Sequence, residues 1–298
     1  MRIYYVTSTN ISTDALIKYK RKNAMVSYFY IRETADKRSL MEKIQGTADS
    51  IELPVMWKNY LKQFDSVMVD SGAYTYQIKS GMYMDKQKAG IDLTSISFKK
   101  LDEFTEQYGQ WLAANKDHFD YYVEMDVDKL VGLPKVEEYR NYLETCTSKQ
   151  CIPVWHSSRG FEYWDKMITD YKYVAIGGVA ANEMTNSERK ISYLISLAHK
   201  KNCKVHGMGF TKFRYLNLIP FDTVDSSTWL SGARHGQLQL YIDKTIKGIL
   251  LRKHGKDSRK VGYKEFYNVN LDSWSLYEKY LEDYWSKQES EEEVLLNE

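Results

Sequence analysis

Short apolar runs recur along the chain, and most of them end at a polar residue or a glycine. Runs that are apolar throughout, with no polar alternation, are typical of strands buried on both faces, as in parallel sheets. Seven runs are predicted to be strands: residues 3–8, 66–72, 121–127, 151–157, 173–179, 204–210 and 221–227. The pattern shows no clear eighth strand.

Segments with helical spacing lie between these runs. Apolar residues form one stripe along residues 98–116. Pro134 is placed to open a second helix, and residues 185–188 have the form of a capping box ahead of a third. Alternating strands and helices predict parallel βα units, hence an α/β fold of the (β/α)8 TIM-barrel type, with a doubly wound sheet as the alternative. Residues 1–286 are predicted to form one barrel domain with C-terminal helices, and residues 287–298 an acidic, frayed tail.

Composition narrows the class of protein. With 298 residues and 43% hydrophobic residues, the chain can build one large core. The net charge is only +2, so a nucleic-acid partner would need a local basic face. The three cysteines, Cys146, Cys151 and Cys203, do not have the spacing of a zinc site. An odd number of cysteines is also a poor basis for a disulfide framework, so the sequence favours a reducing compartment. With no signal peptide or membrane-length run, we expect a soluble, cytoplasmic protein with no membrane partner.

Ionisable side chains stand near the ends of the predicted strands. Asp70, Asp126 and Asp222 come from three different runs, and barrel enzymes place reactive groups at the carboxyl ends of strands. Such a set suits covalent catalysis at a sugar carbon, because one carboxylate can trap an oxocarbenium-like centre while another moves the proton. Each residue alone also has a structural interpretation, as a helix cap or a turn residue.

Six motifs occur in order along residues 66–236. They are VDSGAYT (69–75), EMDVD (124–128), PVWHSS (153–158), AIGGVA (175–180), HGMGF (206–210) and FDTVDSSTWLSGARHG (221–236). Together they resemble the tRNA-guanine transglycosylase superfamily. The resemblance is closer to its DNA-modifying branch, the DpdA-like 7-deazaguanine transglycosylases of phages and bacterial modification islands.

The resemblance implies a mechanism and a site. Asp222 would be the nucleophile that attacks C1′ and expels guanine, and Asp70 the general acid and base that protonates the leaving base. Asp126 would bind the Watson–Crick edge, where a carboxylate accepts from N1–H and the 2-amino group and so selects guanine-like bases. Tyr74 and Met208 would sandwich the ring. The full set of implied base-contacting residues is Ser71, Tyr74, Asp126, His156, Gly177, Gly178 and Met208.

The sequence also departs from the tRNA enzymes. They carry a zinc subdomain near the C-terminus, whereas this chain has no cysteine after Cys203, so we expect no structural zinc. No metal or organic cofactor is needed for the exchange. Asp225 lies three residues after Asp222, and on a regular strand the two point to opposite faces, so only one can face the barrel mouth.

Basic residues late in the chain are candidates for phosphate contacts. They are Arg234, His235, Lys253, Arg259 and Lys260, the last three within the basic segment 244–264. The alternative is that the basic segment is only a solvated helix face.

The predicted function is replacement of guanine in DNA by a 7-deazaguanine such as preQ0, with DNA and that free base as partners. Three alternatives remain open: the same exchange on tRNA, a carboxylate-based glycoside or nucleoside hydrolase, and a non-catalytic nucleic-acid-binding barrel.

Overall fold

The structure is a computed structural model that describes residues 1–32, 51–79, 94–177, 188–210, 213–230, 237–250 and 263–297. The chain divides into two compact units. The first unit contains Met1–Asn23 and Trp155–Glu298, and the second contains Ala24–Val154.

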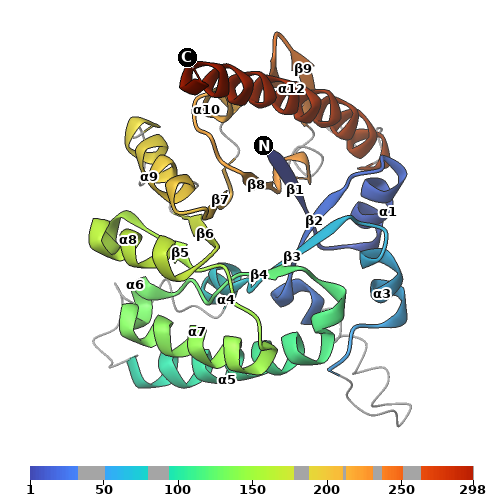
Figure 1. The fold of residues 1–298 in the computed structure, drawn as a ribbon. Coiled ribbons are helices and arrows are strands. Elements are labelled where there is room, and N and C mark those ends of the chain that lie inside the picture. The colour runs from blue at the N-terminus through green and yellow to red at the C-terminus, as the bar shows by residue number, and fades with distance from the viewer. Residues whose placement is uncertain are drawn as a thin grey trace. The chain divides into compact units, whose positions relative to one another are not determined.

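Eight strands form one parallel sheet. Figure 1 labels these strands along the ribbon. They are β1 (Arg2–Thr7), β2 (Asn23–Ser27), β3 (Ser66–Asp70), β4 (Tyr121–Tyr122), β5 (Val154–Trp155), β6 (Tyr173–Ile176), β7 (Lys204–Gly207) and β8 (Thr223–Ser226). Their order is β4-β3-β2-β1-β8-β7-β6-β5. A parallel bridge between Val123 and Ile152 links the segments next to β4 and β5, the two ends of that order. The fold is therefore α/β of the (β/α)8 barrel type, which confirms the predicted fold class.

In the first unit, helices cover the outer face of the strands. They are α1 (Asn10–Lys18), the 3-10 helix η3 (Ser157–Arg159), α8 (Gly160–Asp170), α9 (Glu188–Lys200), α10 (Phe213–Leu216) and α12 (Tyr263–Asn297). The hairpin of β9 (Gln237–Ile242) and β10 (Thr245–Leu250) packs against α12. Tyr5 of β1 marks the outer face, since its ring lies edge-on to Trp229 and Trp274, and its hydroxyl donates to Glu278 of α12 at 2.9 Å.

The second unit is built around a pair of packed helices. Its helices are α3 (Val55–Leu61), α4 (Ala73–Lys79), α5 (Thr94–Asn115), η2 (Lys116–His118), α6 (Asp128–Val131) and α7 (Leu133–Thr147), and α5 packs against α7. A buried ion pair joins α7 to the sheet, with Arg140 Nη2 2.6 Å from Glu124 Oε2. The other oxygen of Glu124 accepts from the backbone N–H of Val154 at 2.8 Å. Glu124 thus fixes the start of β5.

All seven predicted strands are present, although most are shorter than predicted. The strand that the pattern did not reveal is β2, whose five residues are all buried. Its apolar run continues directly into helical residues 28–32, so the run has no boundary that would separate strand from helix. The hairpin of β9 and β10 was not predicted either. The segment predicted to be a frayed tail is helical as far as Asn297, because α12 continues through it.

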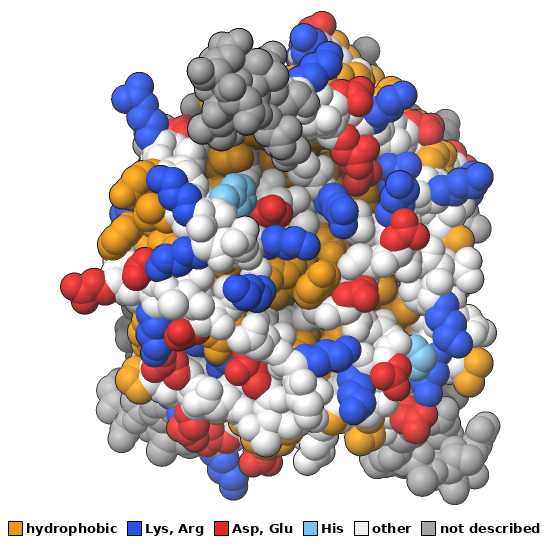
Figure 2. Space-filling model, in the orientation of Figure 1, with side chains coloured by type: hydrophobic (Ala, Val, Ile, Leu, Met, Phe, Trp, Pro, Cys, Tyr) orange, Lys and Arg blue, Asp and Glu red, His pale blue; other side chains and the backbone are white. Residues whose placement is uncertain are grey.

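The surface carries charges of both signs. The face drawn in Figure 2 has Lys and Arg side chains interspersed with Asp and Glu, as expected from 42 basic and 40 acidic residues. Among the described residues, no helix is both long enough and apolar enough to span a membrane.

Candidate active site

The DSG segment forms a tight turn at the carboxyl end of β3. Asp70 is the last residue of the strand, and its Oδ2 accepts from the backbone N–H of Gly72 at 3.0 Å. The Ser71 hydroxyl oxygen, which is buried, accepts from the N–H of Ala73 at 3.3 Å, where α4 begins. Burial, followed by the negative charge of Asp70, raises the pKa of Tyr108 well above its usual range. The turn therefore holds the Asp70 carboxylate at the end of its strand, and its role as general acid and base stays a prediction.

This turn requires glycine at position 72. Gly72 has φ +70°, and a Cβ there would lie 2.4 Å from the Phe29 Cβ and 2.6 Å from the Ser27 Oγ. We expect Gly72→Ala to lower the free energy of unfolding by about 3 kcal/mol, from backbone strain plus overpacking. Urea unfolding followed by tryptophan fluorescence measures the loss.

Gly132 is the matched control. It also has positive φ, +80°, but an added Cβ would meet only the Pro134 Cδ, at 3.8 Å. Gly132→Ala should therefore show the strain alone, about 1–2 kcal/mol. Equal losses in the two variants would mean that the close approach of Gly72 to Ser27 and Phe29 does not constrain the turn.

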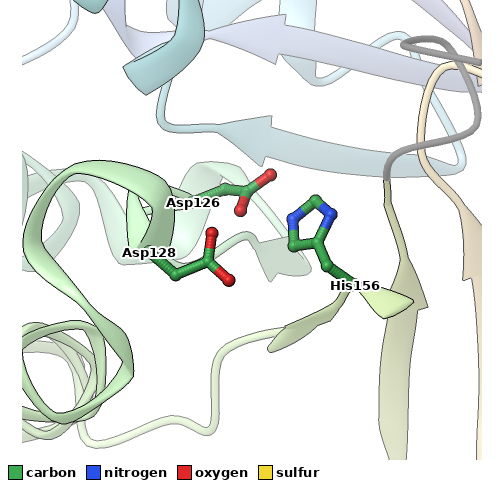
Figure 3. A group of neighbouring side chains, drawn as sticks. All are labelled: Asp126, Asp128 and His156. Carbon is green, nitrogen blue, oxygen red and sulfur yellow. The ribbon is translucent and has the colours of Figure 1, made fainter. Parts of the chain in front are cut away.

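The EMDVD segment contributes acids with different roles. Glu124 is fully buried and bound to Arg140, so its role is structural. Asp126 follows β4, and Asp128 opens α6; both are half-buried and project from this segment in Figure 3. A carboxylate oxygen of each lies within 4.8 Å of one of the other. The two carboxylates are close enough for both to contact one cation, and the role of Asp126 in base binding stays a prediction.

Three predicted base-contacting residues of the first unit follow successive strands. His156, also drawn in Figure 3, comes directly after β5 and is 6% exposed. Gly177 follows β6, and its N–H donates to the Trp155 carbonyl at 2.9 Å. Met208 follows β7, is half-buried, and donates its N–H to the Ile176 carbonyl at 3.0 Å. All three lie at carboxyl ends of strands, where barrel active sites form.

The predicted position of Asp222 is wrong. Asp222 precedes β8, at the amino end of the strand, and its Oδ2 accepts from the N–H of Val205 at 2.7 Å, near the start of β7. The same oxygen lies 3.0 Å from His199 Nε2 near the end of α9. Burial, followed by the charge of Asp222, raises the pKa of Cys203 to about 11. Asp222 therefore faces the helical layer at the end of the barrel opposite to the predicted site.

Asp225 occupies the place predicted for the nucleophile. It lies in the second half of β8, and its Oδ1 accepts from the N–H of Gly209 at 2.5 Å, beyond the carboxyl end of β7. The same oxygen is 3.2 Å from His206 Nε2. The prediction that Asp222 and Asp225 point to opposite faces of the strand is confirmed. Thr223 and Asp225 both bond to His206 on the inner face, whereas Asp222 faces outward.

For the remaining predicted site residues, the structure gives little or no information about their roles. Tyr74 lies in α4 with 66% of its surface exposed, so its role as one side of a base sandwich stays a prediction. Gly178, Arg234, His235, Lys253, Arg259 and Lys260 lie outside the described residues. The predicted phosphate contacts therefore stay predictions as well.

A (β/α)8-type fold with ionisable side chains at the carboxyl ends of its strands has the arrangement of a barrel enzyme. No protein-family model and no curated protein matches this sequence. One similar solved structure is that of a protein named as a fructose-1,6-biphosphate aldolase from Coccidioides immitis. It is 11% identical, with a TM-score of 0.31, over 95% of this chain and 88% of that chain. A likeness at this level says nothing about the reaction.

Proposed function

We propose that this chain is a transglycosylase that replaces guanine in DNA with a 7-deazaguanine such as preQ0. The observation that carries the proposal is Asp225 at the carboxyl end of β8, with one carboxylate oxygen held by the Gly209 N–H and by His206. Asp70 ends another strand of the same parallel sheet. In the proposed enzyme, Asp225 would be the nucleophile and Asp70 the general acid and base for one nucleotide, since barrel enzymes use residues at the carboxyl ends of their strands.

In the proposed first step, an oxygen of Asp225 attacks C1′ of the target nucleotide. The C1′–O bond forms as the bond between C1′ and N9 of guanine breaks, and Asp70 gives its proton to the departing base. In the second step the incoming base loses its N9 proton to Asp70 and attacks C1′, and the Asp225 carboxylate leaves. The steps balance without an oxidant or reductant, because one glycosidic bond replaces another.

The base-binding roles follow the sequence motifs. Asp126, half-buried after β4, would accept hydrogen bonds from N1–H and the 2-amino group, which adenine does not offer. His156, Gly177 and Met208 would contact the base from the ends of β5, β6 and β7. DNA is favoured over tRNA because the chain has no cysteine after Cys203 with which to build the zinc subdomain of the tRNA enzymes.

The test is incubation of the full chain with guanine-containing DNA or with tRNA, plus isotope-labelled preQ0. We expect nucleoside mass spectrometry to find the label in DNA, with about one guanine released for each base inserted, since each exchange makes and breaks one glycosidic bond. Label in tRNA alone would mean that the protein carries out the same exchange on tRNA and not on DNA. Abasic sites without label would identify a hydrolase, and two unchanged polymers would favour a binding protein.

A further inference from the structure

A buried histidine lies behind Asp225 on the inner face of the first unit. His206, in β7, is 0% exposed, and its ring lies edge-on to Tyr4 of β1 and Tyr173 of β6. Its Nδ1 is 2.7 Å from the Thr223 hydroxyl, and its Nε2 is 3.2 Å from Asp225 Oδ1. The Thr223 hydroxyl in turn bonds to the Tyr173 hydroxyl. These four side chains form one chain of hydrogen bonds across β6, β7 and β8.

The direction of these bonds follows from counting protons. An ionised Asp225 can only accept, so His206 Nε2 carries a proton and donates it. In a neutral ring Nδ1 is then an acceptor, and the Thr223 O–H must donate to it. Because Thr223 has only one hydroxyl proton, Tyr173 must donate to Thr223. The network thus favours a single tautomer of His206, the one that donates to Asp225.

The two oxygens of Asp225 differ in their surroundings. Oδ1 accepts both bonds, from the Gly209 N–H and from His206. Within the part of the chain that the structure describes, Oδ2 makes no hydrogen bond. Two bonds to one oxygen fix the plane of the carboxylate and leave the other oxygen as the stronger nucleophile.

We propose that His206 is a positioning residue for Asp225, that Thr223 and Tyr173 fix its tautomer, and that Oδ2 is the attacking oxygen. This inference rests on the proposed base exchange. When Oδ2 bonds to C1′, Oδ1 becomes the carbonyl oxygen of the ester. It keeps the hydrogen bonds from His206 and Gly209, which polarise the ester and assist departure of the carboxylate in the second step. The proton of His206 stays on Nε2 throughout.

The test compares paired substitutions in the full chain by the single-turnover rate of adduct formation with DNA. His206→Phe removes the donor, and we expect the rate to fall about 100-fold, as for a misplaced reacting group. His206→Gln keeps an amide N–H donor and should recover at least about 10-fold of that loss. In Thr223→Val the rate of adduct formation should fall about 10-fold, and in Thr223→Ser it should be closer to the parent rate. DNA affinity should change less than about 2-fold in all of them, because these residues are buried.

Tyrosine substitutions provide the matched control. Tyr173→Phe removes the hydroxyl that bonds to Thr223 and should slow adduct formation about 3- to 10-fold. Tyr277→Phe removes another buried hydroxyl of the same unit, which donates to the Phe213 carbonyl at 3.0 Å, and should leave the rate unchanged. Equal effects of Tyr173→Phe and Tyr277→Phe, or a His206→Phe variant that is folded and as fast as the parent, would overturn the positioning role.

A second measurement separates this inference from the proposed function. ¹⁵N NMR of the parent protein should show His206 protonated at Nε2 and not at Nδ1, and Thr223→Val should weaken that preference. The opposite tautomer would refute the network even if base exchange occurs. If the tautomer is as expected but no polymer is modified, the proposed function fails, and with it the role of His206 in attack at C1′.

Discussion

Asp225→Asn is expected to abolish the covalent adduct between the protein and DNA, with base exchange falling at least about 1000-fold. An amide cannot replace a carboxylate as a nucleophile, and loss of a nucleophile removes most of the catalysis that depends on the covalent step. The adduct is measured by denaturing gel electrophoresis after incubation with labelled DNA without the incoming base. The product is measured by nucleoside mass spectrometry.

Asp222→Asn is the matched control for this prediction, three residues away on the same segment. Its carboxylate binds the Val205 N–H and His199 at the amino end of the sheet, so the variant should still form the adduct. An Asn oxygen can still accept from Val205, so we expect a loss of stability of only about 1 kcal/mol. An adduct that survives Asp225→Asn but disappears in Asp222→Asn would return the nucleophile to Asp222.

The largest expected effect on stability is that of the buried pair between Glu124 and Arg140. Both side chains are almost fully buried, and Glu124 also accepts from the Val154 N–H. Glu124→Leu leaves the Arg140 guanidinium buried without this carboxylate, so the free energy of unfolding should fall by about 3–5 kcal/mol. The measurement is urea unfolding monitored by far-ultraviolet circular dichroism.

Two further variants show whether charge burial is the cause. The double variant Glu124→Leu with Arg140→Met removes both charges and should recover much of the loss. Lys135→Ala breaks more exposed ion pairs, to Asp102 at 3.1 Å and Glu138 at 2.8 Å, and should change stability by less than about 1 kcal/mol. No recovery in the double variant would assign the loss to the lost hydrogen bond with Val154 and to packing.

Much of the fold was predictable from local pattern. Buried parallel strands need apolar side chains on both faces, so each predicted strand appears as a short apolar run whatever surrounds it. The stripe along α9, which buries Ile191, Leu194, Ile195 and Ala198, is likewise a local property of helical spacing. The apolar pattern does not reveal a strand that continues directly into an apolar helix, and for this reason β2 was not predicted.

The sequence by itself determined that Asp222 and Asp225 point to opposite faces of one strand, since side-chain direction alternates along any extended chain. It could not determine which of them faces inward, because that depends on where β8 begins relative to β7. The register sets His206 opposite Thr223, which turns Asp225 toward the interior histidine and leaves Asp222 with α9. Only the tertiary structure shows that Glu124 and Asp126 differ in their surroundings, since Glu124 is buried against Arg140 and Asp126 is half-buried. Burial and partners are properties of the packed chain, and residue type and spacing do not specify them.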